Sequence, residues 1–209
     1  MSKASQLPDA AEARFWHGIA AAGRFFVGEA DVQKALEQLA RILDAHGIPY
    51  AIVGAMALNE FGYQRTTVDV DVLLTPEGLA AFKAQALGRG YVEKFPGSRG
   101  VRDATHGVDI DVVLTGAFPG DGKPKPVAFP DPATAALRGT RVALLPLSML
   151  VELKLASGMT APHRLRDLAD VQELIRIQGL PREFALQLHA YVRETYLDLW
   201  QAVQGSHDE

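Results

Sequence analysis

The sequence contains no cysteine among its 209 residues. This absence excludes disulfide bonds, zinc sites built from thiolates and cysteine nucleophiles. Histidines are present, but the spacing of His46, His106, His163 and His189 is not that of a zinc site or of a catalytic triad. We therefore assign no histidine a functional role.

Long apolar segments are also absent. No apolar run approaches the ~18–20 residues that a membrane-spanning helix requires. The opening residues, MSKASQLP, lack the apolar core of a signal peptide. These absences predict a cytoplasmic protein without a membrane partner.

The sequence also lacks an excess of positive charge, because its formal net charge is −4 at pH 7. This charge argues against a protein that is coated for nonspecific nucleic-acid binding, and it leaves a local basic patch open. The hydrophobic content of 48% and charged content of 22% are those of an ordinary soluble globular protein. The chain is long enough to bury a substantial core.

The order of apolar patterns along the chain predicts an α+β protein. Apolar residues at helical spacing follow Asp31 up to Gly47, and a second helix is expected from Pro76 to Leu87. Strand-like runs are expected over residues 50–53, 67–74, 107–114 and 141–145. We divide this part of the chain into an N-terminal arm, residues 1–30, and an α+β core, residues 31–145.

The remainder of the chain, residues 146–209, is predicted to be a helical segment. One helix is expected from Pro146 to Ala156, and Thr160 is expected to cap the start of the next. Between the core strands, residues 116–126 are dense in Gly and Pro and predict an ordered loop or lid. Lys123 and Lys125 in that loop either contact phosphate or lie at a solvated tip.

The most informative stretch is residues 50–74. It opens with a short apolar run that stops at Gly54-Ala55, continues into a brief helix and ends in a strand. Side chains alternate between the two faces of a strand, so Asp69 and Asp71 lie on one face and the valines on the other. Two adjacent carboxylates either form a solvated outer face or seat a divalent cation, because hard cations prefer oxygen ligands.

These residues resemble the nucleotidyltransferase superfamily of the polymerase-β type, and most closely its AbiEii-like branch. The family pattern has a hydrophobic strand, then Gly-Gly or Gly-Ser opening a helix, then Asp-x-Asp on the next strand and a third acid on a later one. Here the three parts are Val53-Gly54-Ala55, Asp69-Val70-Asp71 and residues 108–112. The resemblance covers about residues 50–177. Ala55 departs from the pattern, since it offers only its backbone N–H where the family prefers Gly or Ser.

The resemblance implies a small mixed twisted sheet of nucleotidyltransferase type, with flanking helices and a C-terminal helical segment. It also implies Mg²⁺ (or Mn²⁺), held by Asp69, Asp71 and the third acid. In such chemistry two metal ions ~3.5–4 Å apart stabilise the attacking and leaving oxygens. The triphosphate would approach the backbone at Gly54 and Ala55.

The third acid is either Asp109 or Asp111, because the two share a strand face and alternation alone does not choose between them. Asp111 lies in the middle of the predicted strand and is held more rigidly, which suits a carboxylate that must orient an acceptor hydroxyl. We therefore predict Asp111.

Basic residues complete the predicted nucleotide site. Arg65 either steadies a phosphate or pairs with a nearby acid. Lys154 resembles the lysine that the family presents to the triphosphate, and its alternative is to extend its ammonium into solvent. Asp167 and Asp170, which share a face of the next helix with Arg164, either brace the site or form an intrahelical charge ladder.

Three functions are consistent with these residues. The leading hypothesis is a metal-dependent nucleotidyltransferase that moves a nucleoside monophosphate from a nucleoside triphosphate to an RNA or protein hydroxyl, as the toxin of a toxin–antitoxin pair with an antitoxin partner. The second is a catalytically inactive nucleotide-binding or protein-interaction module of the same fold, which Ala55 favours. The third is a phosphohydrolase that uses water as acceptor.

Overall fold

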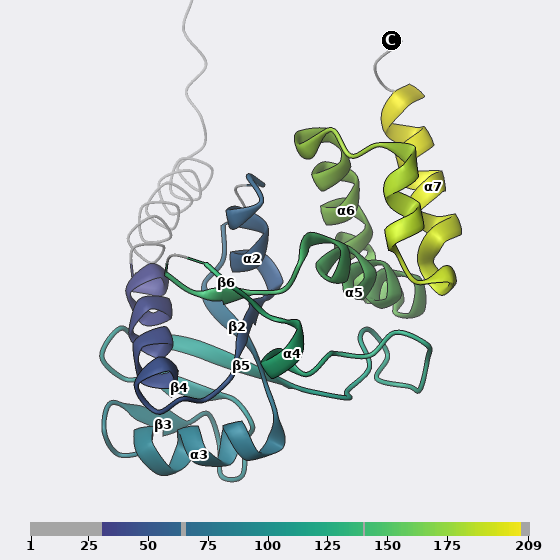
Figure 1. The fold of residues 1–209 in the computed structure, drawn as a ribbon. Helices are drawn as coiled ribbons and strands as arrows, with labels where there is room; N and C mark the ends of the chain where they lie inside the picture. Colours follow the sequence, from purple (N-terminus) through teal and green to yellow (C-terminus); the bar gives the residue numbers. More distant parts are fainter. Residues whose placement is uncertain (1–30, 64–65, 140, 206–209) are drawn as a thin grey trace, which may run out of the picture.

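The computed structural model describes residues 31–63, 66–139 and 141–205. The predicted N-terminal arm, residues 1–30, lies outside this part of the chain. The described residues form a seven-stranded mixed sheet with helices on both faces, followed by helices alone (Figure 1). The predicted α+β class, with its mixed sheet and C-terminal helices, is confirmed.

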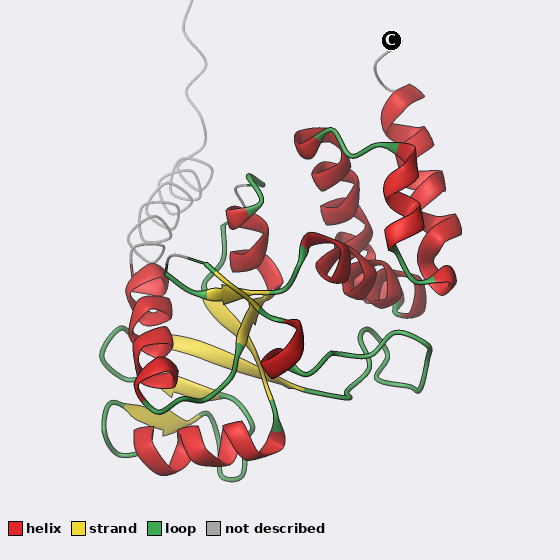
Figure 2. Cartoon of the chain, in the orientation of Figure 1, coloured by secondary structure: helices red, strands yellow, loops and turns green. Residues whose placement is uncertain are grey.

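The sheet has the strand order β3-β4-β5-β2-β1-β7-β6, and Figure 2 shows its strands in yellow between the red helices. Its centre pairs β1 antiparallel to β2, and β2 parallel to β5. Its strands are β1 (Ala51–Val53), β2 (Asp69–Leu74), β3 (Tyr91–Glu93), β4 (Val101–Asp103), β5 (Val108–Leu114), β6 (Leu137–Arg138) and β7 (Ala143–Leu144).

The helices begin and end largely where capping chemistry places them. The hydroxyl of Thr75 accepts from the backbone N–H of Gly78 at the start of α3, and Gly179 takes a left-handed φ of 58° at the end of α6. Besides a helix over residues 31–45, the helices are α2 (Gly54–Glu60), α3 (Pro76–Ala86), α4 (Pro132–Ala135), α5 (Leu147–Thr160), α6 (Leu165–Gln178) and α7 (Ala190–Gly205), with short 3₁₀ turns η1 (Pro162–Arg164) and η2 (Arg182–Gln187).

Two hydrophobic clusters hold the layers together, one on each face of the sheet. The first packs the helix over residues 31–45 and α3 against the β2 face that carries Val70 and Val72. The second packs α2, α5, α6 and α7 against the opposite face, which carries Val53 and Leu73. Since side chains alternate along a strand, the aspartates of β2 lie on this second face, the one that the C-terminal helices share.

Several element boundaries differ from the sequence expectation, and the strand expected over residues 141–145 is limited to β7, Ala143–Leu144. The strand predicted over residues 67–74 begins at Asp69, where its pairing with β5 begins, and Val68 is 59% exposed. The predicted helix break between Ala156 and Thr160 is wrong. Thr160 is the last residue of α5, and its hydroxyl donates back to the carbonyl of Ala156 instead of capping the next helix.

Within the described residues, none of the helices combines the length and the apolar character that crossing a membrane requires.

Candidate active site

The register between β2 and β5 places four carboxylates on one sheet face. The two strands run parallel, with Asp69 beside Asp109 and Asp71 beside Asp111. Neighbouring strands lie ~4.8 Å apart, so each pair is within reach of a shared ligand. Both candidates for the third acid therefore lie on the predicted face, and Asp111 is the one beside Asp71.

Gly54 joins β1 to α2 directly against this acidic face. Its φ is +66°, a conformation that side-chain-bearing residues rarely adopt. A Cβ atom at this position would lie 1.9 Å from Oδ2 of Asp71. Two features therefore require a glycine at position 54: its backbone conformation and the close approach of Asp71.

Asp71 carries the strongest electrostatic perturbation among these acids. Burial raises its pKa from 3.8, and the neighbouring charges of Asp69 and Asp111 raise it further, to about 6. The positive charges of Lys154 and Arg164 act in the opposite direction. Asp71 is therefore mostly ionised at neutral pH, but at a cost in free energy that an added cation among the carboxylates would relieve.

The outer carboxylates are paired with side chains of the described residues. Asp109 accepts from Arg102 at 2.6 Å, and Lys94 Nζ lies 3.2 Å from Asp109 and 2.8 Å from Asp111. Asp69 accepts a hydrogen bond of 2.5 Å from the hydroxyl of Thr67. Sequence reasoning did not identify Lys94, because nothing in the local pattern after β3 indicates contact with a strand two positions away in the sheet.

The donor set fits a divalent cation in chemistry, although its side chains are not gathered into a finished cluster. Within the described residues no three His, Asp or Glu side chains converge closely enough to hold a metal ion. Asp69, Asp71 and Asp111 nevertheless supply oxygen ligands alone, on adjacent strands and the same face, as Mg²⁺ and Mn²⁺ prefer. Lys94 pairs with Oδ1 of Asp111, so a bound cation would either use the other oxygen of this carboxylate or displace the lysine.

Lys154 is buried on α5 and binds two carboxylates of α6. Its Nζ donates to Asp167 at 2.9 Å and to Asp170 at 2.7 Å, and Ser157 donates to the second oxygen of Asp167 at 2.7 Å. The alternative of a lysine that extends into solvent is wrong, since only 8% of this side chain is exposed. The acids of α6 pair with a lysine of α5, so these ion pairs join the two helices.

The electrostatics of this cluster favour the ionised form of Asp167. Burial alone would raise the pKa of Asp167, but the charge of Lys154 and the hydrogen bond from Ser157 lower it below its ordinary value. The positive charge of Arg164 contributes in the same direction. The cluster is therefore a buried network of ion pairs and hydrogen bonds at the wall of the cavity.

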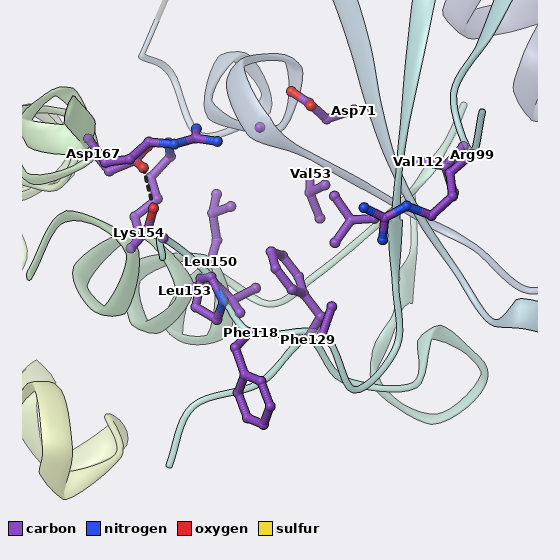
Figure 3. Close-up of a pocket in the computed structure, with 17 residues that line it drawn as sticks. Val53, Asp71, Arg99, Val112, Phe118, Phe129, Leu150, Leu153, Lys154 and Asp167 are labelled. Atoms are coloured by element: carbon purple, nitrogen blue, oxygen red, sulfur yellow. Dashed lines mark hydrogen bonds and ion pairs between the residues drawn. The ribbon is translucent and has the colours of Figure 1, made fainter. Parts of the chain in front are cut away.

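A cavity of about 330 Å³ lies between the acidic face and this cluster. Figure 3 shows Asp71 and Arg99 reaching it from the sheet side, and Lys154 and Asp167 from the helices. Phe129 lies between them. The remaining lining includes Val53, Gly54, Val112, Val113, residues 117–120, Leu150, Leu153, Ser157 and Arg164.

Among the predicted nucleotide-binding residues, Gly54 and Lys154 line this cavity. Ala55 is buried, 6% exposed, and does not line it, so only its backbone could face a ligand. Arg65 lies outside the described residues. Arg99, which sequence reasoning missed, comes from the loop between β3 and β4, and no side-chain spacing links it to the other residues of the site.

Comparisons with known proteins give matches to solved structures alone. No family model matches the chain, and no curated protein matches it. The solution structure of the antibiotic-resistance factor ANT(2″)-Ia matches with 14% identity and a TM-score of 0.48, over 84% of this chain and 95% of that one.

Two crystal structures match at a similar level. ANT(2″)-Ia in complex with adenylyl-2″-tobramycin has 13% identity and a TM-score of 0.48, over 83% of this chain and 97% of that one. A protein from H. pylori described as a nucleotidyltransferase has 15% identity and a TM-score of 0.44, over 86% and 95%.

Proposed function

We propose that the protein is a metal-dependent nucleotidyltransferase, which moves a nucleoside monophosphate from a nucleoside triphosphate to a hydroxyl of an RNA or protein acceptor and releases pyrophosphate. The observation that carries the proposal is the register of β2 and β5, which sets Asp111 beside Asp71, the acid that lines the cavity together with Lys154. Phosphoryl transfer uses carboxylates to hold a divalent cation and positively charged groups to bind the phosphates.

The proposed roles follow from position. Asp69, Asp71 and Asp111 would hold Mg²⁺ (or Mn²⁺), which when bound would stabilise negative charge on the transferring phosphoryl group. A carboxylate oxygen of Asp111 would also accept the proton of the acceptor hydroxyl. The ammonium of Lys154 has three N–H donors, two of which serve Asp167 and Asp170. The third would donate to a triphosphate oxygen in the cavity.

Two finer elements belong to the same proposal. The backbone at Gly54 and Ala55 would approach the triphosphate, because the absence of a side chain at Gly54 leaves this edge of the cavity open. The AbiEii-like resemblance extends the proposal to a cytoplasmic toxin of a toxin–antitoxin pair, with an antitoxin as its protein partner.

A second candidate is a catalytically inactive nucleotide-binding or protein-interaction module of the same fold. Two observations favour it: Asp111 is already paired with Lys94, and the described carboxylates do not converge as a finished metal cluster. Such a module would bind a triphosphate at Lys154 without transferring any part of it.

A thermal unfolding experiment tests the metal and nucleotide site. A nucleoside triphosphate with Mg²⁺ should raise the melting temperature, because a ligand that binds only the native state stabilises it. The double variant Asp69→Asn with Asp71→Asn should lose the metal-dependent part of that rise and keep the part seen with nucleotide alone. If the double variant responds as the parent does, the metal site is wrong.

A transfer assay separates the two candidate functions. The protein is incubated with each labelled triphosphate, Mg²⁺ or Mn²⁺, and total RNA or protein. Asp111→Asn should lower turnover by about 10²-fold or more while nucleotide binding persists, and Asp109→Asn, its neighbour on the same strand face, should be mild. Binding without any labelled product would favour the inactive module, and release of free phosphate alone would indicate a hydrolase.

A further inference from the structure

Lys94 is a cation placed inside the acidic face, between two carboxylates of β5. It directly follows β3, and its Nζ lies 2.8 Å from Oδ1 of Asp111 and 3.2 Å from Oδ2 of Asp109. The lysine side chain is 27% exposed, so this is a partly shielded pair at the rim of the site. One ammonium is thus paired with both acids of β5, and one of them, Asp111, is a proposed metal ligand.

The chain makes room for this lysine. Gly100 lies beneath it, and a Cβ at Gly100 would come 2.9 Å from Cδ of Lys94 and 3.2 Å from Oδ1 of Asp111. The backbone N–H of Lys94 also donates to the carbonyl of Gly100. A side chain at residue 100 would disturb both the lysine stem and the carboxylate, so the local backbone is built around this contact.

The two acids of β5 differ in their dependence on Lys94. Asp109 also accepts from Arg102 at 2.6 Å, so it keeps a cationic partner when Lys94 moves. Among the described residues, Lys94 is the cation that forms an ion pair with Asp111. Displacement of Lys94 would therefore release Asp111, the proposed metal ligand, and leave Asp109 neutralised.

We propose that Lys94 is an internal counter-cation of Asp111, which competes with the divalent cation for this carboxylate and yields when the cation binds. The inference rests on the proposed function, because the competing ion is the metal of the transfer reaction. Lys94 is a positioning residue here. It holds Asp111 against repulsion from Asp71 in the metal-free protein and weakens the binding of a metal ion that arrives without nucleotide.

Titration of Mn²⁺ into the nucleotide-free protein tests this proposal, with free Mn²⁺ measured by electron paramagnetic resonance. Lys94→Met keeps the length of the side chain and removes its charge. It should tighten Mn²⁺ binding roughly three- to tenfold, the range expected for freeing a carboxylate from a partly exposed ion pair. Lys94→Arg retains the charge and should bind as the parent does.

Arg102→Met is the matched control, since it removes a positive charge from the same acidic face but pairs with Asp109 alone. It should leave Mn²⁺ affinity within about twofold of the parent. The double variant Lys94→Met with Asp111→Asn should lose the gain. Circular dichroism on each variant verifies that the fold is retained.

The possible results separate this proposal from the function on which it rests. Equal affinity of parent and Lys94→Met, weaker binding by Lys94→Met, or an equal gain in Arg102→Met would each overturn the counter-cation role and leave the metal site standing. Absence of Mn²⁺ binding in the parent and every variant, with or without triphosphate, would overturn the metal site and this proposal together.

Discussion

Asp71 is the residue at which burial and the charges of neighbouring carboxylates together disfavour the ionised form. Its pKa is raised to about 6, first by burial and then by Asp69 and Asp111. Between an unfolded value near 3.8 and this folded value, the native state binds more protons than the unfolded state. The free energy of unfolding therefore falls as the pH rises from about 4 to about 6, and stays lowered above that.

Asp71→Asn, which cannot ionise, should be more stable than the parent at pH 7.5 by roughly 1–3 kcal/mol, from a shift of about two pKa units at 1.36 kcal/mol each. The advantage should disappear near pH 4, where Asp71 is protonated in the parent. Urea unfolding at both pH values measures this.

Asp109→Asn provides the comparison of opposite sign. Burial would raise the pKa of Asp109, but Arg102 and Lys94 lower it below its ordinary value. Its contribution to stability is therefore present above the unfolded pKa and lost as the pH falls through the folded one. Asp109→Asn should be destabilising at pH 7.5 and neutral at low pH. If Asp71→Asn were less stable than the parent at pH 7.5, the folded protein would stabilise the ionised carboxylate of Asp71, which contradicts this prediction.

At the scale of elements, the contact between α5 and α6 decides how the Lys154 cluster is held. Gly158 lies in α5 where the helices approach, and a Cβ there would come 2.5 Å from Cγ of Leu168 and 3.2 Å from its backbone nitrogen. The helices could not pack this closely around a larger residue. The ion pairs of Lys154 with α6 depend on that separation.

Gly158→Ala should therefore destabilise the protein by about 1–3 kcal/mol through overpacking, a cost that exceeds the ~1 kcal/mol that alanine gains over glycine in a helix. Gly205→Ala, at the end of α7, meets nothing within 4 Å and should be neutral or slightly stabilising. Urea unfolding of both variants measures the difference. Equal stabilisation of the two would mean that the helices separate without cost.

At the scale of the whole molecule, the cavity has walls from three parts of the chain: the sheet, the loop over residues 117–120, and helices α5 and α6. Lys125 connects the second part to the third. Its side chain is 5% exposed, and its ammonium donates to the carbonyl of Pro119, to Asp121 and to the hydroxyl of Thr160 at the end of α5. It lies neither at a solvated loop tip nor among the lining of the cavity.

Lys125→Met should loosen this loop, because it removes all three bonds at once. Amide hydrogen exchange over residues 116–126 should become faster, since exchange reports local opening, and triphosphate affinity should fall because a wall of the cavity is less ordered. Lys123→Met is the control at an exposed neighbour. Unchanged exchange in Lys125→Met would show that backbone contacts alone hold the loop.

Local chemistry made much of the fold predictable. Helices begin or end at Gly47, Pro76 and Gly179, because the backbone preferences of glycine and proline depend on the residue itself. The sequence-based predictions fail where a local signal competes with packing. Thr160 and Pro162 look like a helix start, yet α5 continues to Thr160 because its apolar residues are buried against the sheet and α6.

By itself, the sequence determined the α+β class, the Gly54 turn and the common face of Asp69 and Asp71, because these follow from period-two alternation and from the conformational freedom of glycine. Only the tertiary structure decided which acid of β5 lies beside Asp71, that Lys154 is buried against α6, and that Lys94 and Arg99 belong to the site. Those facts depend on strand register and on helix packing between residues far apart in the chain. No local pattern encodes them, since contacts across strands and helices exist only once the sheet and its layers have assembled.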